Sequence, residues 1–187
     1  NNRIPYNFHR INVADYFGDC VEEVGLDLEQ RGIKLNYSNL VSPDTVVIAD
    51  PEQMKKVINN IISNSVKYMD KPDGHIDIRI LDEVDSIQVE IEDNGKGIAQ
   101  KDLQKIFERF YTADPSRARQ KGGTGLGMAI AQSVVKAHHG FICASGSDGT
   151  GLTLTVVLPV APLEPRPLAQ TSDERKVDKR GRRPKKQ

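Results

Sequence analysis

Two runs of strictly alternating side chains, HIDIRIL at residues 75–81 and SIQVEIED at residues 86–93, constrain the fold more than any other feature. A period of two places every second side chain on the same face of a strand, so each run predicts a strand with one apolar and one polar face. The short polar segment between the runs predicts that the two strands are neighbours. The apolar face of such a sheet must be covered by other elements.

Helices that could cover this face are predicted from apolar residues at i, i+3, i+4 spacing. They occupy the stretch from about Val13 to near Arg31 and Gly32, residues 51–69, and the stretch from the glycines before Met128 to His139. Asp50 and Pro51 are a capping residue and a first-turn proline, and they predict where the second helix begins. Gly140 is the expected stop of the third helix.

Two further hairpins are expected. Residues 33–37 and 45–49 both alternate, and a glycine-containing turn separates FICAS at 141–145 from LTLTVVLP at 152–159. With a short helix at residues 101–107, the order α-β-β-α-β-β-α-β-β predicts an α/β (α+β) two-layer sandwich. Its mixed, largely antiparallel sheet would have about five to six strands, with three main helices on one face.

The chain has 187 residues, enough for one domain, which we place at residues 1–159. Residues 160–187 form a proline-rich and then basic tail with little apolar surface to bury, and we expect it to be disordered. The net charge is zero, but from Glu164 onward there are nine Lys and Arg and only four Asp and Glu, so the preceding domain is acidic. An acidic domain gives no support to nucleic-acid binding.

Composition also bears on the membrane and on the redox environment. No apolar run approaches the roughly 20 residues of a membrane span, and no signal-peptide pattern is present at the N-terminus. Cys20 and Cys143 form no disulfide framework and lack the spacing of metal ligands. We expect both to be buried free thiols in a reducing cytoplasm.

Asparagines mark one face of the second predicted helix. Asn60 and Asn64 are four residues apart, so they lie on the same face, with Lys67 one turn further along. An amide oxygen suits a Mg²⁺ ion that takes its other oxygens from water and phosphate, and Lys67 could neutralise phosphate charge. A polar helix face wetted by solvent is the alternative.

The segment EDNGKGI follows the second alternating strand. Asp93 stands at the end of the strand, where a fixed carboxylate can accept a hydrogen bond from an exocyclic amine such as N6 of adenine. Gly95 and Gly97 would let a ring approach the backbone. The alternative is an ordinary surface turn.

The segment GGTGLGMAI matches neither of two common phosphate motifs. It lacks the G-x-x-x-x-G-K-[ST] spacing, and Ile130 stands where G-x-G-x-x-G would require glycine. Glycines before a helix can still bind an anion through backbone N–H groups and the helix dipole, and a flexible linker is the alternative. Upstream, IFERFY concentrates three of the ten Phe and Tyr residues, which suits a lid anchored by aromatic rings.

The order of these stretches resembles the catalytic and ATP-binding domain of sensor histidine kinases, within the superfamily of gyrase, heat-shock chaperone, histidine kinase and mismatch-repair ATPases. NNIISNSVKY resembles the N box, EDNGKGI the first glycine box, IFERFY the F box and GGTGLGMAI the second glycine box. The similarity covers about residues 8–159, and the F box favours the histidine-kinase branch. It implies a Bergerat-type ATP-binding fold with a lid at about residues 99–123.

The resemblance also implies residue roles. Asn64 would coordinate Mg²⁺, Asn60 and Lys67 would act beside the phosphates, and Asp93 would bind adenine N6. The other nucleotide-binding candidates are Tyr68 near the sugar, Gly95, Gly97 and Ile98 in the base pocket, Phe107 and Phe110 as lid anchors, Arg117, Arg119 and Lys121 as lid cations, and Gly123, Thr124, Gly125, Leu126 and Gly127 at the lid hinge and the phosphates.

The phosphoacceptor histidine of a sensor kinase has no counterpart. His9, His75, His138 and His139 lack its sequence context, so we expect all four to be structural or surface residues. The resemblance then implies a cytoplasmic module, monomeric by itself, of a longer, membrane-anchored, homodimeric kinase. Its partners would be ATP or ADP, its own dimerisation domain and a response regulator. The alternatives are an anti-sigma-type serine kinase of the same superfamily and a degenerate module that only binds.

Overall fold

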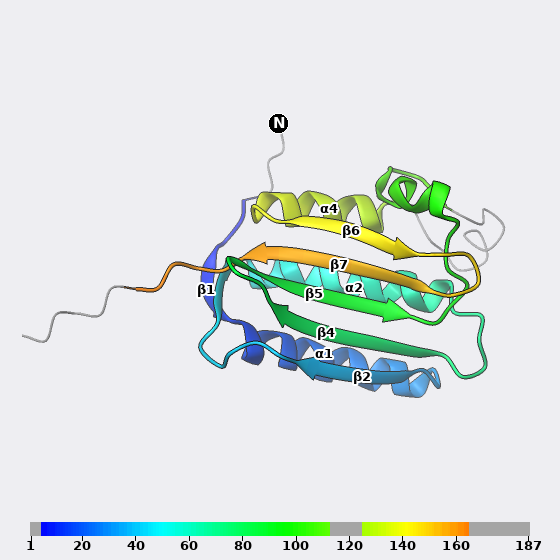
Figure 1. The fold of residues 1–187 in the computed structure, drawn as a ribbon, viewed down its shortest axis with the longest axis horizontal. Coiled ribbons are helices and arrows are strands. Elements are labelled where there is room, and N and C mark those ends of the chain that lie inside the picture. Colours follow the sequence, from blue (N-terminus) through cyan, green and yellow to red (C-terminus); the bar gives the residue numbers. More distant parts are fainter. Residues whose placement is uncertain (1–4, 113–124, 165–187) are drawn as a thin grey trace, which may run out of the picture.

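The computed structural model describes residues 5–112 and 125–164 of the chain. Its elements are β1 (His9–Asn12), α1 (Val13–Gln30), β2 (Lys34–Asn39), β3 (Val46–Ala49), α2 (Pro51–Lys67), β4 (His75–Asp82), β5 (Ser86–Asp93), the 3-10 helix η1 (Gln100–Phe107), α4 (Gly127–Ala137), β6 (Phe141–Gly146) and β7 (Leu152–Pro159). Figure 1 shows two layers, a sheet in front and the helices α1, α2 and α4 behind it. The predicted α/β sandwich is confirmed.

The main sheet has five strands in the order β2-β4-β5-β7-β6, and β1 and β3 form a separate two-stranded sheet. β2 and β4 are parallel, whereas every other neighbouring pair in the main sheet is antiparallel. The alternating runs of the sequence are β4 and β5, which pair directly, with Ile78 opposite Ile91. The mixed, largely antiparallel sheet is therefore as expected.

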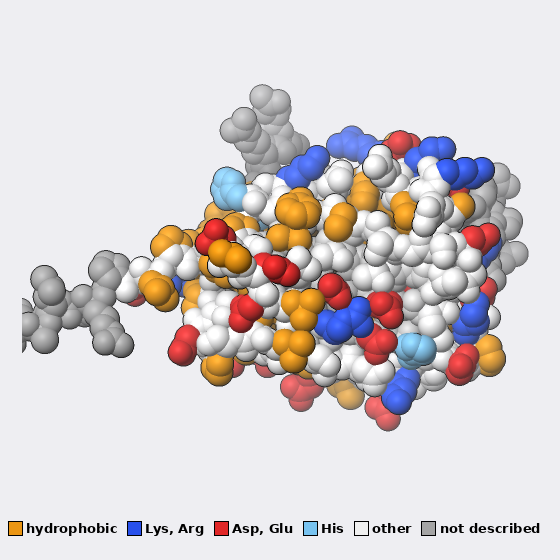
Figure 2. Space-filling model, viewed as in Figure 1, with side chains coloured by type: hydrophobic (Ala, Val, Ile, Leu, Met, Phe, Trp, Pro, Cys, Tyr) orange, Lys and Arg blue, Asp and Glu red, His pale blue; other side chains and the backbone are white. Residues whose placement is uncertain are grey.

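Alternation divides the sheet into a covered and an uncovered face. The largest side chains of the core include Ile76, Ile78 and Ile80 from β4, Ile87 and Ile91 from β5, Leu154 and Leu158 from β7, and Met54 and Ile61 from α2. On the uncovered face, Arg79 pairs with Glu90 at 3.0 Å and with Glu92 at 3.2 Å. Figure 2 views this face, on which hydrophobic, acidic and basic side chains are interspersed. The pattern is typical of a sheet with one side in water.

The expected hairpin between residues 33–37 and 45–49 is wrong. β2 pairs in parallel with β4, and β3 pairs with β1 instead. Parallel neighbours require a crossover connection, which α2 supplies between β2 and β4. β1 was not predicted, because its four residues are exposed or half-buried and do not alternate.

The third main helix ends earlier than the sequence indicated. α4 ends at Ala137 with His138 as its C-cap, and His139 adopts the left-handed conformation, with a φ of 61°, that glycine usually provides. Gly140 is required for a different reason. A Cβ at Gly140 would overlap the carbonyl oxygen of Val157 in β7.

One of the two cysteine predictions is also wrong. Cys20 is buried in α1, but Cys143 is exposed. Cys143 lies on β6, which is an edge strand. It shares the uncovered face with Phe141, which is 58% exposed. An apolar residue type on this strand therefore does not indicate burial.

The chain stays bonded to the domain just beyond β7. Val160 forms an isolated bridge with Val47, and the N–H of Ala161 donates to the carbonyl oxygen of Val46 at 2.7 Å. Residues 165–187, which hold most of the expected tail, lie outside the described residues. Within the described part of the chain, none of the helices has the length and apolarity required to cross a membrane.

Candidate functional site

The stretches singled out in the sequence meet at one end of the molecule. The C-terminal half of α2, the end of β5, η1 and the first turn of α4 all lie at the right-hand end of Figure 1. They are far apart in the sequence, and α4 contacts both α2 and η1. The fold therefore assembles the four boxes into one region.

Asn60 and Asn64 lie on the same face of α2, and both are half-buried. The side-chain amide of Asn60 donates to the carbonyl oxygen of Gly127 at 3.1 Å, which holds the first turn of α4 against α2. Within the described residues, the Asn64 side chain makes no hydrogen bond. Asn60 thus has a structural bond, and the Asn64 amide can accept a ligand.

The C-terminal end of α2 approaches the middle of the expected lid. The Tyr68 hydroxyl lies 3.1 Å from the hydroxyl oxygen of Thr112, and the Lys67 ammonium nitrogen lies 5.4 Å from the centre of the Tyr68 ring. These contacts bring a cation and two hydroxyls to the same side as Asn64.

Asp93 is a buried carboxylate, 5% exposed, at the end of β5. Its Oδ1 accepts the N–H of Gly95 at 2.9 Å. Burial raises the pKa of Asp93. The N–H of Gly95, the hydroxyl of Ser65 and the N–H of Leu152 lower this pKa in part. A desolvated carboxylate with fixed donors on its own loop is typical of a binding site.

Gly95 and Gly97 allow the loop after β5 to pass between two backbone segments. A Cβ at Gly95 would lie 2.7 Å from the carbonyl oxygen of Tyr68, which already accepts the N–H of Lys96 at 3.0 Å. At Gly97, φ is +71° and a Cβ would overlap the carbonyl oxygen of Ser147. Side chains are therefore excluded on both sides of this loop.

Phe110, in the middle of the expected lid, is joined through its backbone to Gly125, just beyond the lid. The N–H of Phe110 donates to the carbonyl oxygen of Gly125 at 2.9 Å, and both residues have positive φ values, 65° and 71°. The Phe107 side chain packs against the core, whereas Phe110 is 72% exposed. Only Phe107 has the packing expected of an anchor.

The remaining candidates divide into two groups. Ile98 is buried beside the loop after β5, and Leu126 is the half-buried N-cap residue of α4. Arg117, Arg119, Lys121, Gly123 and Thr124 lie outside the described residues.

Sequence reasoning missed two residues that border Asp93. Ser65 is buried on α2 with its hydroxyl toward the carboxylate, and a Cβ at Gly151 would overlap the carbonyl oxygen of Asp93. Ser65 could have been found, because it is a polar residue one turn after Ile61 on an otherwise apolar stripe. Gly151 has no such signal, since its role depends on the pairing of β5 with β7.

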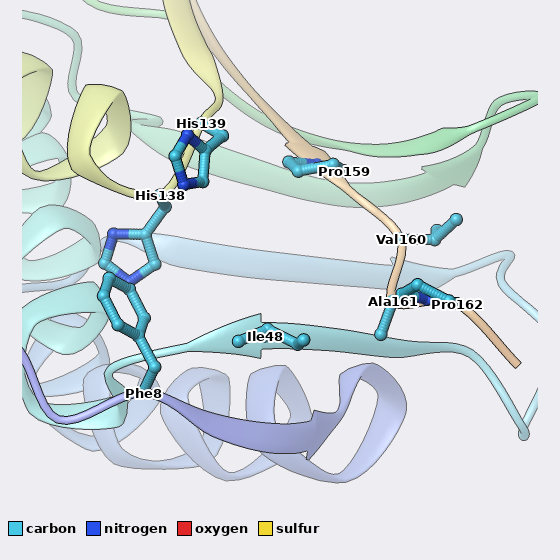
Figure 3. A pocket seen from close by; sticks show the side chains of 8 residues that line it. All are labelled: Phe8, Ile48, His138, His139, Pro159, Val160, Ala161 and Pro162. Atoms are coloured by element: carbon cyan, nitrogen blue, oxygen red, sulfur yellow. The ribbon is translucent and has the colours of Figure 1, made fainter. Parts of the chain in front are cut away.

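A pocket of about 340 Å³ lies at the opposite end of α4, away from the glycine boxes. It is lined by Phe8, Ile48, His138, His139 and the chain from Pro159 to Pro162 (Figure 3). His138 is buried, its Nε2 accepts the N–H of Asp50 at 2.9 Å, and its Nδ1 then donates to the carbonyl oxygen of Val134 at 2.7 Å. Figure 3 places its ring against that of Phe8, 5.1 Å between centres. His138 is therefore structural, as expected.

The oxygen donors near the glycine boxes indicate which metal could fit. In residues 5–112 and 125–164, no three His, Cys, Asp or Glu side chains are grouped so as to hold a metal ion. An amide oxygen on α2 is a weak, neutral ligand by itself. It fits a Mg²⁺ ion that takes most of its ligands from water and phosphate, and not a metal held by protein alone.

Comparisons with known proteins agree with this geometry. The family model described as histidine kinase-, DNA gyrase B- and HSP90-like ATPase matches residues 49–162. Sensor histidine kinase WalK of Bacillus subtilis (strain 168) is 42% identical over 158 residues, which is 82% of this chain and 25% of WalK. Signal transduction histidine-protein kinase BaeS of Escherichia coli (strain K12) is 37% identical over 131 residues, 70% of this chain and 27% of BaeS. The chain thus spans about a quarter of these relatives.

Solved structures share the fold. The catalytic domain of histidine kinase ThkA superposes with a TM-score of 0.70 at 22% identity, covering 83% of this chain and 99% of that domain. The mycobacterial sensor histidine kinase MprB superposes with a TM-score of 0.68 at 23% identity, covering 84% and 100%. ThkA has also been solved in complex with the response regulator protein TrrA. On its fold, its assembled boxes and the matched family model, this chain belongs to the family of histidine kinase-, DNA gyrase B- and HSP90-like ATPases.

Proposed function

We propose that this chain is the ATP-binding catalytic domain of a sensor histidine kinase. It binds Mg-ATP and presents the γ-phosphoryl group to a histidine of a dimerisation domain, from which the group passes to a response regulator. The similarity to WalK and BaeS supports the kinase branch. As part of such a kinase, the domain would lie on the cytoplasmic side of a homodimeric, membrane-anchored protein.

The observation that carries the proposal is Asp93. It is a buried carboxylate at the end of β5, and the loop that follows it packs closely against the backbone at Gly95 and Gly97, so that a fixed acceptor is available for the edge of a base. Adenine presents an amine donor at that edge, whereas guanine presents a carbonyl oxygen there. The carboxylate therefore selects adenine nucleotides.

The phosphates would lie along α2 and the first turn of α4. Asn64 would hold a Mg²⁺ ion, which would supply positive charge to stabilise the phosphates during phosphoryl transfer. Lys67 supplies a positive charge one turn away. The first backbone N–H groups of α4, and its dipole, attract the phosphate chain.

Nucleotide binding is tested by isothermal titration with ATP and Mg²⁺. Asp93→Asn should weaken ATP binding about 10- to 100-fold, since a hydrogen bond to a charged acceptor is lost. Asp85→Asn is the matched control, because Asp85 is exposed at the other end of β5. Unchanged ATP affinity in Asp93→Asn would contradict the assignment of the base pocket.

Phosphoryl transfer is tested with γ-labelled ATP. Because His138 is buried and none of the four histidines has the context of a phosphoacceptor, the chain alone should bind ATP without becoming labelled. Acid-labile label should appear on a dimerisation domain added from the same kinase. Acid-stable label on a partner's serine would favour the anti-sigma-type kinase instead.

A further inference from the structure

Ser65 is a polar residue on the buried face of α2. It lies one turn after Ile61 and is 1% exposed, and within the described residues its hydroxyl has no hydrogen-bond partner. An unpaired buried hydroxyl is unfavourable, and alanine forms helices more readily than serine. Serine at this position is therefore unfavourable for the fold and requires another explanation.

The group that Ser65 faces is the carboxylate of Asp93. Burial raises the pKa of Asp93, and the Ser65 hydroxyl, which is close to this carboxylate but makes no direct hydrogen bond within the described residues, is one of the groups that lower it. Within the described residues, the other buried hydroxyl without a partner is that of Tyr37, whose pKa is raised by burial and by the nearby Cys20. Ser65 thus differs from an incidental unpaired hydroxyl in what it faces.

The surroundings of Asp93 show what a hydrogen-bond donor on α2 would contribute. The N–H of Gly95 holds Oδ1 from the loop side, and the carboxylate of Glu92, on the opposite face of β5, disfavours the ionised form. Only the ionised carboxylate is purely an acceptor for a base amine. A donor on the α2 side would both orient the carboxylate and keep it ionised.

We propose that Ser65 is a positioning residue for adenine recognition. In the nucleotide-bound protein, its hydroxyl donates to the Asp93 carboxylate, directly or through one water molecule, and directs that carboxylate toward the exocyclic amine. This inference rests on the proposed function, because it requires that Asp93 binds the adenine amine.

The test compares ATP with inosine triphosphate, which has a carbonyl oxygen in place of the amine. Ser65→Ala should weaken ATP binding about tenfold, the effect of one hydrogen bond to a charged group, and should leave inosine triphosphate binding unchanged. Ser63→Ala is the matched control, because Ser63 is exposed two residues earlier on the same helix. It should change neither affinity.

Two further measurements separate positioning from a structural role. In Ser65→Ala, the loss of ATP affinity on acidification should begin at a higher pH than in the wild type, because Asp93 gains a proton more readily. The pH profile for inosine triphosphate reports the other titrating groups. In the Asp93→Asn background, Ser65→Ala should have no additional effect on ATP binding. Thermal unfolding should show Ser65→Ala to be at least as stable as the wild type.

The outcomes distinguish this inference from the proposed function. If the wild-type chain binds ATP and inosine triphosphate equally, the adenine assignment fails, and the inference fails with it. If the wild type prefers ATP and Asp93→Asn abolishes the preference, but Ser65→Ala behaves like Ser63→Ala, only the inference is overturned.

Discussion

Replacing Gly97 by alanine should destabilise the domain at the end that carries the candidate site. The residue has a φ of +71°, and a Cβ would overlap the carbonyl oxygen of Ser147 and lie 2.9 Å from that of Gly151. The left-handed backbone costs an L-residue about 1–2 kcal/mol. Relief of the overlap requires the loop after β5 to move away from the β6–β7 connection.

That movement would weaken the hydrogen bond from the N–H of Gly149 to the carbonyl oxygen of Lys96, at 2.6 Å, which contributes about 1 kcal/mol. Together these effects predict a loss of about 2–3 kcal/mol in the free energy of unfolding, measured by urea denaturation followed by circular dichroism. Nucleotide affinity should fall as well, because this loop directly follows Asp93, to which we assign the recognition of adenine.

Gly127→Ala is the matched control. A Cβ there would lie 3.6 Å from the Asn60 side chain, an ordinary contact, and its φ is not positive. Alanine in a helix reduces the entropy of the unfolded chain, so Gly127→Ala should be neutral or stabilising by up to about 1 kcal/mol. A Gly97→Ala protein within about 0.5 kcal/mol of the wild type would refute the argument from close approach.

Two predictions concern the rest of the domain. A thiol reagent should modify Cys143 alone in the native protein and reach Cys20 only after unfolding, since one thiol is exposed and the other buried; equal native reactivity would contradict this. Burial lowers the pKa of His138 below the ordinary 6.5, so the unfolded chain binds its proton first as the pH falls. The free energy of unfolding should therefore decrease below about pH 6.5, by at most about 1.4 kcal/mol per pH unit, in urea titrations. His138→Gln should lose this slope and His139→Gln, on the exposed neighbour, should keep it.

Local patterns predicted the elements well where one face is buried and the other is wet. The alternation of β4 and β5 gave their bounds and their pairing, and Asp50 gave the start of α2, where its carboxylate accepts the N–H groups of Glu52 and Gln53. These features depend only on residues that are close together in the sequence, so they can be predicted from local sequence patterns.

Pairings between distant segments could not be derived in this way. The parallel pairing of β2 with β4 depends on the path of α2, and that of β1 with β3 joins segments with no alternation between them. The exposure of Cys143 follows from the place of β6 at the edge of the sheet, and the role of Gly151 from the pairing of β7 with β5.

The candidate site shows the same division. Asn60, Asn64 and Asp93 were predicted as site residues from spacing and strand ends, and the structure brings α2 and β5 into contact. Ser65 was missed because a serine among isoleucines is read as part of a helix and not as a neighbour of a carboxylate on β5. Packing between the helix layer and the sheet decides which groups a side chain contacts, and the sequence pattern does not show this packing.

The pairing of β1 with β3 determines how this domain must be excised for any experiment. The family match begins at residue 49, yet a fragment starting there would lack β1, α1, β2 and all of β3 except Ala49. β4 would lose the strand that pairs with it, and Asp50 would lose the N–H of Asn7 at 2.8 Å. A fragment cut at the family boundary should therefore aggregate, while one that begins before Tyr6 keeps a closed core.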